Sequence, residues 1–285
     1  MPVEMIMDDA ETLANSGFYW RERDGVKVLV CKPIEDAGFV NAFSTRLGGV
    51  SDFPKDSLNL AGFDEDSADN IHENRRRFLN AIGEDFRLAT AWQVHGDGIK
   101  IVKDLIDVQN NEERFDGLVS QMPGVLLGAK TADCVPVLIG DQGTGAFAAI
   151  HAGWRGTVNS IVVRAIEKMQ SEFGSESINM IAAIGPAAGC GNYEIGDDVI
   201  KAFADKFEGS EKYFKPTRDG HALVDLHLAN KDQLLSCGVP MNAIYTAPFC
   251  TMERPDLFFS YRLEKRKYGK TGRLLSVIGR THKTY

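Results

Sequence analysis

Three short segments place a histidine or a cysteine among glycine and aspartate at the end of an apolar run. They are residues 92–96 (WQVHG), 131–136 (TADCVP) and 151–157 (HAGWRGT). Strand ends and the loops that leave them are where a rigid scaffold presents reactive groups. His95, Cys134 and His151 supply two imidazoles and one thiol, which is a three-ligand set for a catalytic zinc with the fourth position left to water or substrate.

The same three residues support two other chemistries, because spacings of 39 and 17 residues are too wide to form a metal motif alone. A blue-copper centre also uses two histidines and a cysteine, although a multi-copper oxidase would need more imidazoles, in His-x-His pairs that this sequence lacks. Alternatively, Cys134 is a nucleophile activated by His151 or His95, with Asp133 orienting the imidazole.

Three arginines indicate a site for an anion. Arg155 follows a predicted strand and precedes a predicted helix that begins near Thr157, so its guanidinium lies beside the first amide groups of that helix. Arg46 begins the glycine-rich turn RLGGVS, and Arg262 ends the run FFSYR. Guanidinium groups bind phosphate in a bidentate manner, so we expect Arg46, Arg155 and Arg262 to bind substrate or phosphate.

Short apolar runs bounded by Gly, Asp and Pro are the elements that must position these residues. They predict strands over residues 26–31, 38–43, 89–94, 124–130, 135–140, 145–150, 178–185, 221–226, 243–247, 257–262 and 273–279. Helical spacing predicts helices over residues 69–82, 157–173, 197–207 and 226–237. Because strands outnumber helices without strict alternation, we expect an α+β fold with layered mixed β-sheets flanked by helices. Residues 1–285 are expected to form a single domain, with residues 1–20 peripheral.

The charge is unevenly distributed along the 285 residues. The net charge is −8, which disfavours nucleic acid as a partner. The last 32 residues carry +7 and the first 253 carry −15. We therefore expect the basic tail, residues 254–285, to fold back over a site that handles an anion.

The remaining composition favours a cytoplasmic protein. Five irregularly spaced cysteines argue against a disulfide framework, and the acidic N-terminal segment lacks the order of a signal peptide. No apolar run approaches the roughly 20 residues that span a bilayer. We expect a monomer that binds small molecules and neither nucleic acid nor membrane.

A series of motifs resembles the laccase-domain family, whose members were first called polyphenol oxidases and later understood as zinc-dependent purine nucleoside phosphorylases. In order, the motifs are FSTRLGGVS, SLNL, ENRRRF, WQVHG, DGLVS, TADCVPVL, AAIHAGWRGT, IGPAAG, YEIGDDV, FFSYR and TGRLLSVIG. The resemblance runs from about residue 43 to residue 279. One departure is Cys190-Gly191-Asn192-Tyr193-Glu194, where relatives commonly have Cys-Cys-Tyr-Glu.

The resemblance implies a site and an activity. His95, Cys134 and His151 would bind zinc, with copper less favoured. From the residues themselves we expect Cys134, His151 and Asp133 to be the catalytic residues, with Asp133 acting through the side chains that bind the metal. The implied reaction converts adenosine, inosine, guanosine or methylthioadenosine and phosphate to the free base and ribose 1-phosphate, with adenosine deamination as a further activity. The alternatives are a Cys-dependent amidase acting on a peptidoglycan-precursor amide and a copper-dependent polyphenol oxidase.

Overall fold

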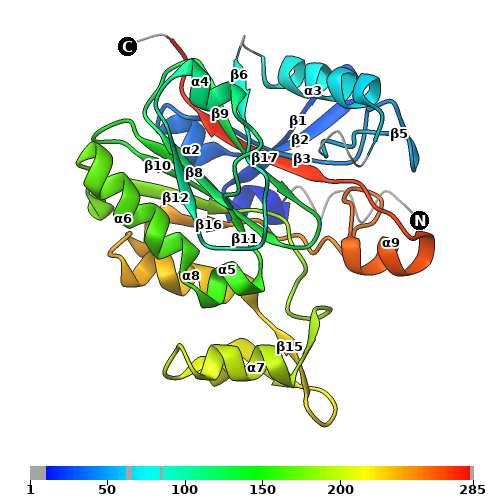
Figure 1. Cartoon of the computed structure of the whole chain (residues 1–285), viewed down its shortest axis with the longest axis vertical. Helices are drawn as coiled ribbons and strands as arrows, with labels where there is room; N and C mark the ends of the chain where they lie inside the picture. Colours follow the sequence, from blue (N-terminus) through cyan, green and yellow to red (C-terminus); the bar gives the residue numbers. More distant parts are fainter. Residues whose placement is uncertain (1–10, 62–65, 84–85, 283–285) are drawn as a thin grey trace.

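Two six-stranded β-sheets lie face to face at the centre of the protein (Figure 1). The computed structural model describes residues 11–61, 66–83 and 86–282. The first sheet has, in spatial order, β1 (Phe18–Arg23), β2 (Val26–Cys31), β3 (Val40–Ser44), β17 (Leu274–Gly279), β9 (Val125–Thr131) and β6 (Arg87–Ala89). The second has β16 (Ile244–Thr246), β12 (Met180–Ile184), β10 (Val135–Asp141), β11 (Phe147–Ala152), β8 (Gly117–Ser120) and β7 (Ile99–Val102).

Both sheets mix antiparallel and parallel pairs. In the first sheet β6 runs parallel to β9, and in the second β12 runs parallel to β16 and β7 parallel to β8. The longer central pairs, including β10 with β11 and β17 with β9, are antiparallel. This arrangement confirms the α+β fold with layered mixed sheets.

Helices cover the outer face of each sheet and give the fold four layers (Figure 1). In the described part of the chain, α3 (Ala68–Ile82) covers the first sheet, and α5 (Trp154–Val158), α6 (Ile161–Phe173) and α8 (Leu226–Ser236) cover the second. The other helices with assigned bounds are α2 (Lys32–Asp36), α4 (Leu105–Gln109), α7 (Asp197–Ala204) and α9 (Tyr261–Tyr268). Strand β10 shows why both faces of the second sheet are apolar. Val137 and Ile139 pack with α6 and α8, while Leu138 points into the core between the sheets, because successive strand residues face opposite sides.

Helix α3 packs on the outer face of the first sheet. Phe78, Ala81 and Ile82 are buried there against β2 and β17. The hydroxyl of Ser67 accepts the Asn70 amide hydrogen at the start of the helix, and the helix ends at a glycine with left-handed backbone. Helix α3 therefore has the boundaries that its sequence pattern predicts.

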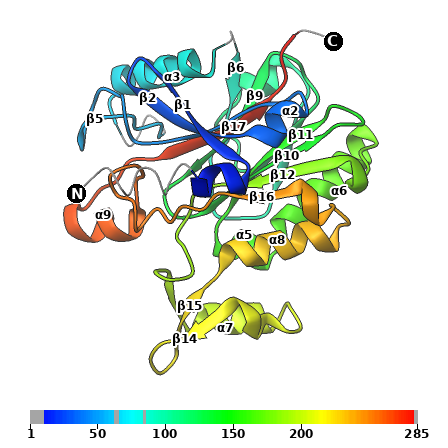
Figure 2. The same cartoon turned by 180° about the vertical axis from the view of Figure 1, so that it is seen from behind.

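A small unit projects from the end of the second sheet. It contains β13 (Glu194–Gly196), β14 (Phe214–Pro216), β15 (His221–Val224) and α7, and it lies at the bottom of both views (Figure 2). A two-stranded hairpin, β4 (Ser51–Asp52) with β5 (Lys55–Ser57), lies beside α3. Three single turns of 3₁₀ helix, Ser177–Asn179, Ser210–Tyr213 and Met241–Ala243, connect other elements. Within the described residues, no helix has the length and apolarity needed to cross a membrane.

Three predicted elements differ from the structure. The helix predicted over residues 157–173 is interrupted, because Ser160 adopts left-handed backbone between α5 and α6. The strand predicted over residues 257–262 is wrong: Phe258 and Phe259 are buried outside any ladder, and Ser260 accepts the Leu263 amide hydrogen to begin α9. Of residues 89–94, only Ala89 lies in a strand, the end of β6. Further along, the Gln93 side chain takes the place of a paired strand, because its amide accepts the Lys130 N–H and donates to the Lys130 carbonyl.

The basic tail is part of the folded core. Strand β17 pairs with β3 on one side and β9 on the other, so residues 274–279 lie in the middle of the first sheet. Lys283 belongs to the same tail but lies outside the described residues. At the other end of the chain, residues 1–10 of the expected peripheral segment also lie outside, while Leu13 and Phe18 are buried in the core between the sheets.

Candidate functional site

Strand register brings two of the predicted residues together at one end of the second sheet. Cys134 directly precedes β10, and His151 lies near the end of the neighbouring strand β11. Pro136 pairs with His151 in that ladder, so the residue that follows β11 lies opposite Cys134. A separation of 17 residues in the sequence thus becomes contact across a hairpin.

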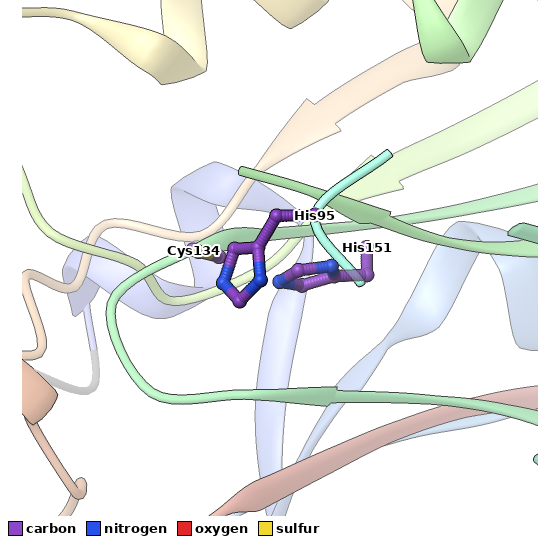
Figure 3. A group of neighbouring side chains, drawn as sticks. All are labelled: His95, Cys134 and His151. Carbon is purple, nitrogen blue, oxygen red and sulfur yellow. The ribbon is translucent and has the colours of Figure 1, made fainter. Parts of the chain in front are cut away.

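The third residue, His95, comes from the turn between β6 and β7. Figure 3 shows the His95 ring in front of Cys134 and beside His151. The ligand atoms of all three side chains lie within 4.8 Å of one another. The two imidazole rings meet edge to face, with centroids 4.9 Å apart and an interplanar angle of 81°.

The three side chains of the cluster differ in burial. His151 is only 3% exposed, Cys134 is half-buried and His95 is exposed. Gly153 leaves the space that the cluster occupies, because a Cβ there would lie 3.1 Å from the Cys134 sulfur and 3.3 Å from Cδ2 of His95. A side chain at position 153 would therefore compete directly with the three predicted ligands.

The carboxylate that contacts the cluster is Asp116, which was not among the residues predicted from the sequence. Its Oδ1 lies 2.7 Å from Nδ1 of His151. It directly precedes β8, whose first residue, Gly117, pairs with Ile150 of β11, so Asp116 lies opposite His151. The segment DGLVS carried the family resemblance, but its aspartate has the sequence signature of an ordinary turn residue.

Mutual electrostatics favour charged forms of this cluster. Burial raises the pKa of the Cys134 thiol, but the adjacent His151 charge and hydrogen bonds to His151 and His95 outweigh it and bring the pKa to about 6. Burial likewise lowers the pKa of His151, but the Cys134 thiolate and the Asp116 carboxylate raise it to about 9. The pKa of Asp116 is lowered: burial opposes this, and the hydrogen bond to His151 and its charge cause it.

Asp133 does not orient an imidazole, which corrects the expectation from the sequence. Its carboxylate is buried and accepts hydrogen bonds from the Thr251 hydroxyl at 2.7 Å, the Ser260 hydroxyl at 3.1 Å and the backbone N–H of Arg262 at 2.7 Å. Asp133 has left-handed backbone, with φ of 86°, which turns its side chain toward the tail. The residue next to Cys134 in the sequence therefore fastens the basic tail.

Two of the three predicted arginines are exposed on segments that adjoin the cluster. Arg155 lies two residues after Gly153, with its guanidinium 4.3 Å from the centroid of the Trp154 ring. Arg262 lies 5.0 Å from the Tyr193 ring centroid and donates to the Glu194 carbonyl. Burial, followed by the Cys134 charge, raises the pKa of Tyr193 to about 12, so its phenol stays neutral.

Arg46 is engaged inside the protein, contrary to the expectation of a phosphate-binding cation. Its guanidinium pairs with Glu264 at 2.9 Å, and the two side chains are 11% and 10% exposed. It also donates to the Pro255 carbonyl and lies 4.6 Å from the Phe259 ring centroid. The pair holds α9 against the loop that follows β3.

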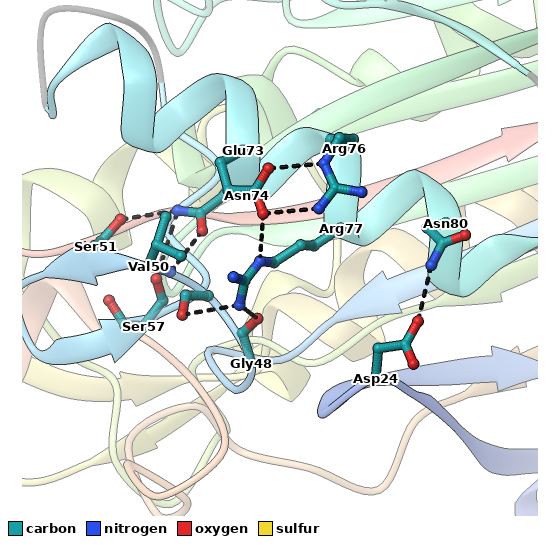
Figure 4. A network of polar contacts seen from close by, with 11 residues as sticks. Asp24, Gly48, Val50, Ser51, Ser57, Glu73, Asn74, Arg76, Arg77 and Asn80 are labelled. Carbon is teal, nitrogen blue, oxygen red and sulfur yellow. Dashed lines mark hydrogen bonds and ion pairs between the residues drawn. The ribbon is translucent and has the colours of Figure 1, made fainter.

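The glycine-rich turn after Arg46 is fastened by α3, as Figure 4 shows. Asn74 is fully buried, accepts the Val50 amide hydrogen at 2.9 Å and donates to the Ser51 hydroxyl at 2.8 Å. Arg77 donates to the Gly48 carbonyl at 3.2 Å. A Cβ on Gly49 would lie 2.1 Å from the Ser57 carbonyl oxygen, so this glycine permits close packing within the chain.

The donor set of the cluster fits zinc. Two imidazole nitrogens and one thiolate are common zinc ligands, and three protein ligands leave one coordination position for water or substrate. With Nδ1 of His151 bonded to Asp116, its Nε2 remains for a metal, which is the usual arrangement for metal-binding histidines. Within the described residues, this is the one group of three or more His, Cys, Asp and Glu side chains placed to share an ion.

Comparisons with known proteins agree on one family. The model of the family described as "Multi-copper polyphenol oxidoreductase laccase" matches residues 40–281. A relative from Bacteroides thetaiotaomicron, named purine nucleoside phosphorylase, is 34% identical over 243 residues, covering 82% of this chain and 89% of the relative. Purine nucleoside phosphorylase YfiH of Escherichia coli is 34% identical over 252 residues, covering 88% of this chain and 98% of the relative.

The fold is likewise shared with a solved structure. The crystal structure of YlmD from Geobacillus stearothermophilus superposes with a TM-score of 0.84 at 33% sequence identity, covering 93% of this chain and 99% of that one. Such coverage means that the two proteins share the layered sheets described above.

Proposed function

The chain belongs to the family described as multi-copper polyphenol oxidoreductase laccase, and from that premise we propose that it is a zinc-dependent purine nucleoside phosphorylase. The observation that carries the proposal is the His95–Cys134–His151 cluster, with His151 bonded to Asp116, in a chain whose relatives are named purine nucleoside phosphorylases. The substrates would be a purine nucleoside and inorganic phosphate.

In phosphorolysis a phosphate oxygen bonds to C1′ of the ribose while the bond from C1′ to the base nitrogen breaks. The electron pair of that bond leaves with the purine, which takes up the proton that the attacking phosphate gives up, and ribose 1-phosphate is the second product. Zinc bound to the cluster would supply a Lewis acid that polarises a substrate oxygen.

The protein groups around the cluster supply positioning and charge. Arg155 is exposed, and within the described part of the chain it has no hydrogen-bond or ion-pair partner, so its guanidinium is available to a phosphate. Arg262 is also exposed, but one of its nitrogens already donates to the Glu194 carbonyl. We therefore assign the main phosphate contact to Arg155 and a secondary one to Arg262, and none to Arg46.

The experiment measures release of hypoxanthine and ribose 1-phosphate from inosine, with and without phosphate. Cys134→Ala should lose both the activity and the bound zinc. The matched control is Cys237→Ala, because Cys237 is also half-buried but ends α8 and takes no part in the cluster. Base release that needs no phosphate, or full activity of Cys134→Ala, would contradict the proposal.

We propose adenosine deamination as a second activity of the same cluster. The oxygen of water bonds to C6 of the purine, the bond from C6 to the exocyclic nitrogen breaks, and ammonia leaves with the transferred proton. Release of ammonia from adenosine in the absence of phosphate tests this activity, and inosine, which has no exocyclic amine, is the control substrate. No ammonia above the control would remove this part of the proposal.

A thiol hydrolase is the other candidate function, and the contact between Asp116 and His151 favours it. Asp116, His151 and Cys134 are arranged as carboxylate, imidazole and thiol, which is the order needed to activate a nucleophilic cysteine. Cys134→Ala that keeps its zinc but loses activity would favour a nucleophilic role for Cys134 over a role as metal ligand. A thiol hydrolase would also stay active in the presence of a chelator and be inactivated by an alkylating agent.

Copper-dependent oxidation is less favoured by the residues. A multi-copper oxidase needs several copper centres and many imidazoles, whereas the chain has six histidines and the described residues offer a single cluster. Elemental analysis of the purified protein distinguishes zinc from copper directly.

A further inference from the structure

Asp116 contacts the segments of two members of the cluster, His151 and His95, and not of His151 alone. Besides Nδ1 of His151, its Oδ1 accepts the backbone N–H of His95 at 2.9 Å. Its Oδ2 accepts the backbone N–H of Gly96 at 2.7 Å and that of Val94 at 3.2 Å. One buried carboxylate, 3% exposed, therefore joins two of the three candidate ligands, which come from different parts of the chain.

The contact with His151 selects one of the two imidazole nitrogens. A carboxylate accepts a hydrogen bond, so Nδ1 of His151 donates to Asp116 and Nε2 is the nitrogen left for a metal. Asp116 also holds the strand itself, because its backbone carbonyl accepts the His151 amide hydrogen at 2.7 Å. Asp116 thus determines which imidazole nitrogen of His151 is left for a metal, and it holds the backbone of His151 in the sheet.

The contact with the turn holds His95 in an uncommon backbone conformation. His95 has φ of 58°, in the left-handed region that residues other than glycine rarely adopt. Three successive backbone N–H groups of this turn converge on the Asp116 carboxylate and form an anion-binding concavity. In this conformation the His95 ring meets the ring of His151 edge to face.

We propose that Asp116 is the positioning residue that sets both imidazoles of the cluster at once. The inference rests on the proposed function, since it assumes that the cluster binds zinc. Loss of outer partners of this kind lowers metal affinity by about 10–100-fold.

The test compares zinc affinity in Asp116→Asn and in a matched control. An asparagine has the shape of aspartate but only one accepting oxygen, so it cannot accept all four hydrogen bonds. Asp141→Asn is the control: Asp141 is also fully buried, accepts the Gly143 N–H and the Thr144 hydroxyl, and lies at the opposite end of β10. Zinc dissociation constants are measured by competition with a chromophoric chelator, and thermal melting reports folding.

We expect Asp116→Asn to bind zinc about 10–100-fold more weakly than the wild type and Asp141→Asn to bind within about threefold of it. A wild-type dissociation constant in Asp116→Asn would overturn the inference. Equal losses in the two variants would also overturn it, because the effect would then reflect general destabilisation.

A second measurement needs no variant. Nitrogen-15 correlation spectra of the zinc-loaded wild-type protein should show the His151 proton on Nδ1, with Nε2 unprotonated. A proton on Nε2 would overturn the inference even if Asp116→Asn failed to fold. Failure of the proposed function is distinguishable from both results: it appears in the wild-type protein, either as absence of bound zinc or as absence of phosphate-dependent base release, and neither depends on residue 116.

Discussion

Removing the Asp133 carboxylate should destabilise the attachment of the basic tail. In Asp133→Ala three donors lose their acceptor: the Thr251 hydroxyl, the Ser260 hydroxyl and the backbone N–H of Arg262. Thr251 and Ser260 are 0% and 1% exposed, so water cannot easily replace the carboxylate. At about 1–2 kcal/mol for each buried group left unsatisfied, the free energy of unfolding should fall by about 3–6 kcal/mol.

Asp133→Asn should cost less. Its amide oxygen can take the place of Oδ2, which accepts from Ser260 and Arg262, and its amide group can donate to the Thr251 hydroxyl oxygen. Asparagine also tolerates the left-handed backbone at this position. We expect a loss of about 1–2 kcal/mol, chiefly from the charge.

Thermal and urea unfolding of both variants provide the assay, together with zinc content. At roughly 2 °C per kcal/mol for a chain of this size, Asp133→Ala should melt about 6–12 °C below the wild type. Asp133→Asn should melt within about 4 °C of it and keep wild-type zinc content. An Asp133→Ala protein as stable as the wild type would refute the reasoning, as would loss of zinc in Asp133→Asn at unchanged stability.

Three further changes test separate parts of the site and the fold. Gly153→Ala should lower zinc affinity at nearly unchanged stability, because the added methyl would lie 3.1 Å from the Cys134 sulfur. Equilibrium dialysis against zinc measures the affinity, and an unchanged dissociation constant would contradict a role for this glycine in the site. In the metal-free protein the pKa of Cys134 is about 6, so the thiolate forms above that pH. The rate of Cys134 alkylation by iodoacetamide should therefore rise through pH 6 and level off near pH 7. A rate that still rises above pH 8 would contradict this pKa. Deletion of residues 254–285 removes β17 from the middle of the first sheet, so we expect no cooperative unfolding transition, and a folded, active truncation would contradict the assigned role of the tail.

Much of the fold follows from local pattern, and the exceptions have physical causes. Strand β2 and helix α3 have the boundaries that apolar spacing and capping residues indicate, within one residue. The run FFSYR has the composition of a strand, but Phe258 and Phe259 are buried by tertiary packing and Ser260 begins a helix. Local sequence cannot distinguish burial in a ladder from burial in a loop.

The candidate site shows the same limit. His95, Cys134 and His151 were predictable because each lies next to an apolar run, the two histidines close to a glycine and the cysteine beside Asp133. Asp116 was not, because its link to His151 depends on the register of β8 against β11. Arg46 was misassigned because its partner Glu264 is more than 200 residues away in the sequence.

We propose that His95, Cys134 and His151 bind the zinc on which phosphorolysis depends. The most direct measurement is phosphate-dependent release of hypoxanthine from inosine by protein stripped with a chelator and then supplied with one metal at a time. We predict that stripping abolishes the release, that zinc restores it, and that copper does not. Release that persists without metal, or that only copper restores, would contradict the account.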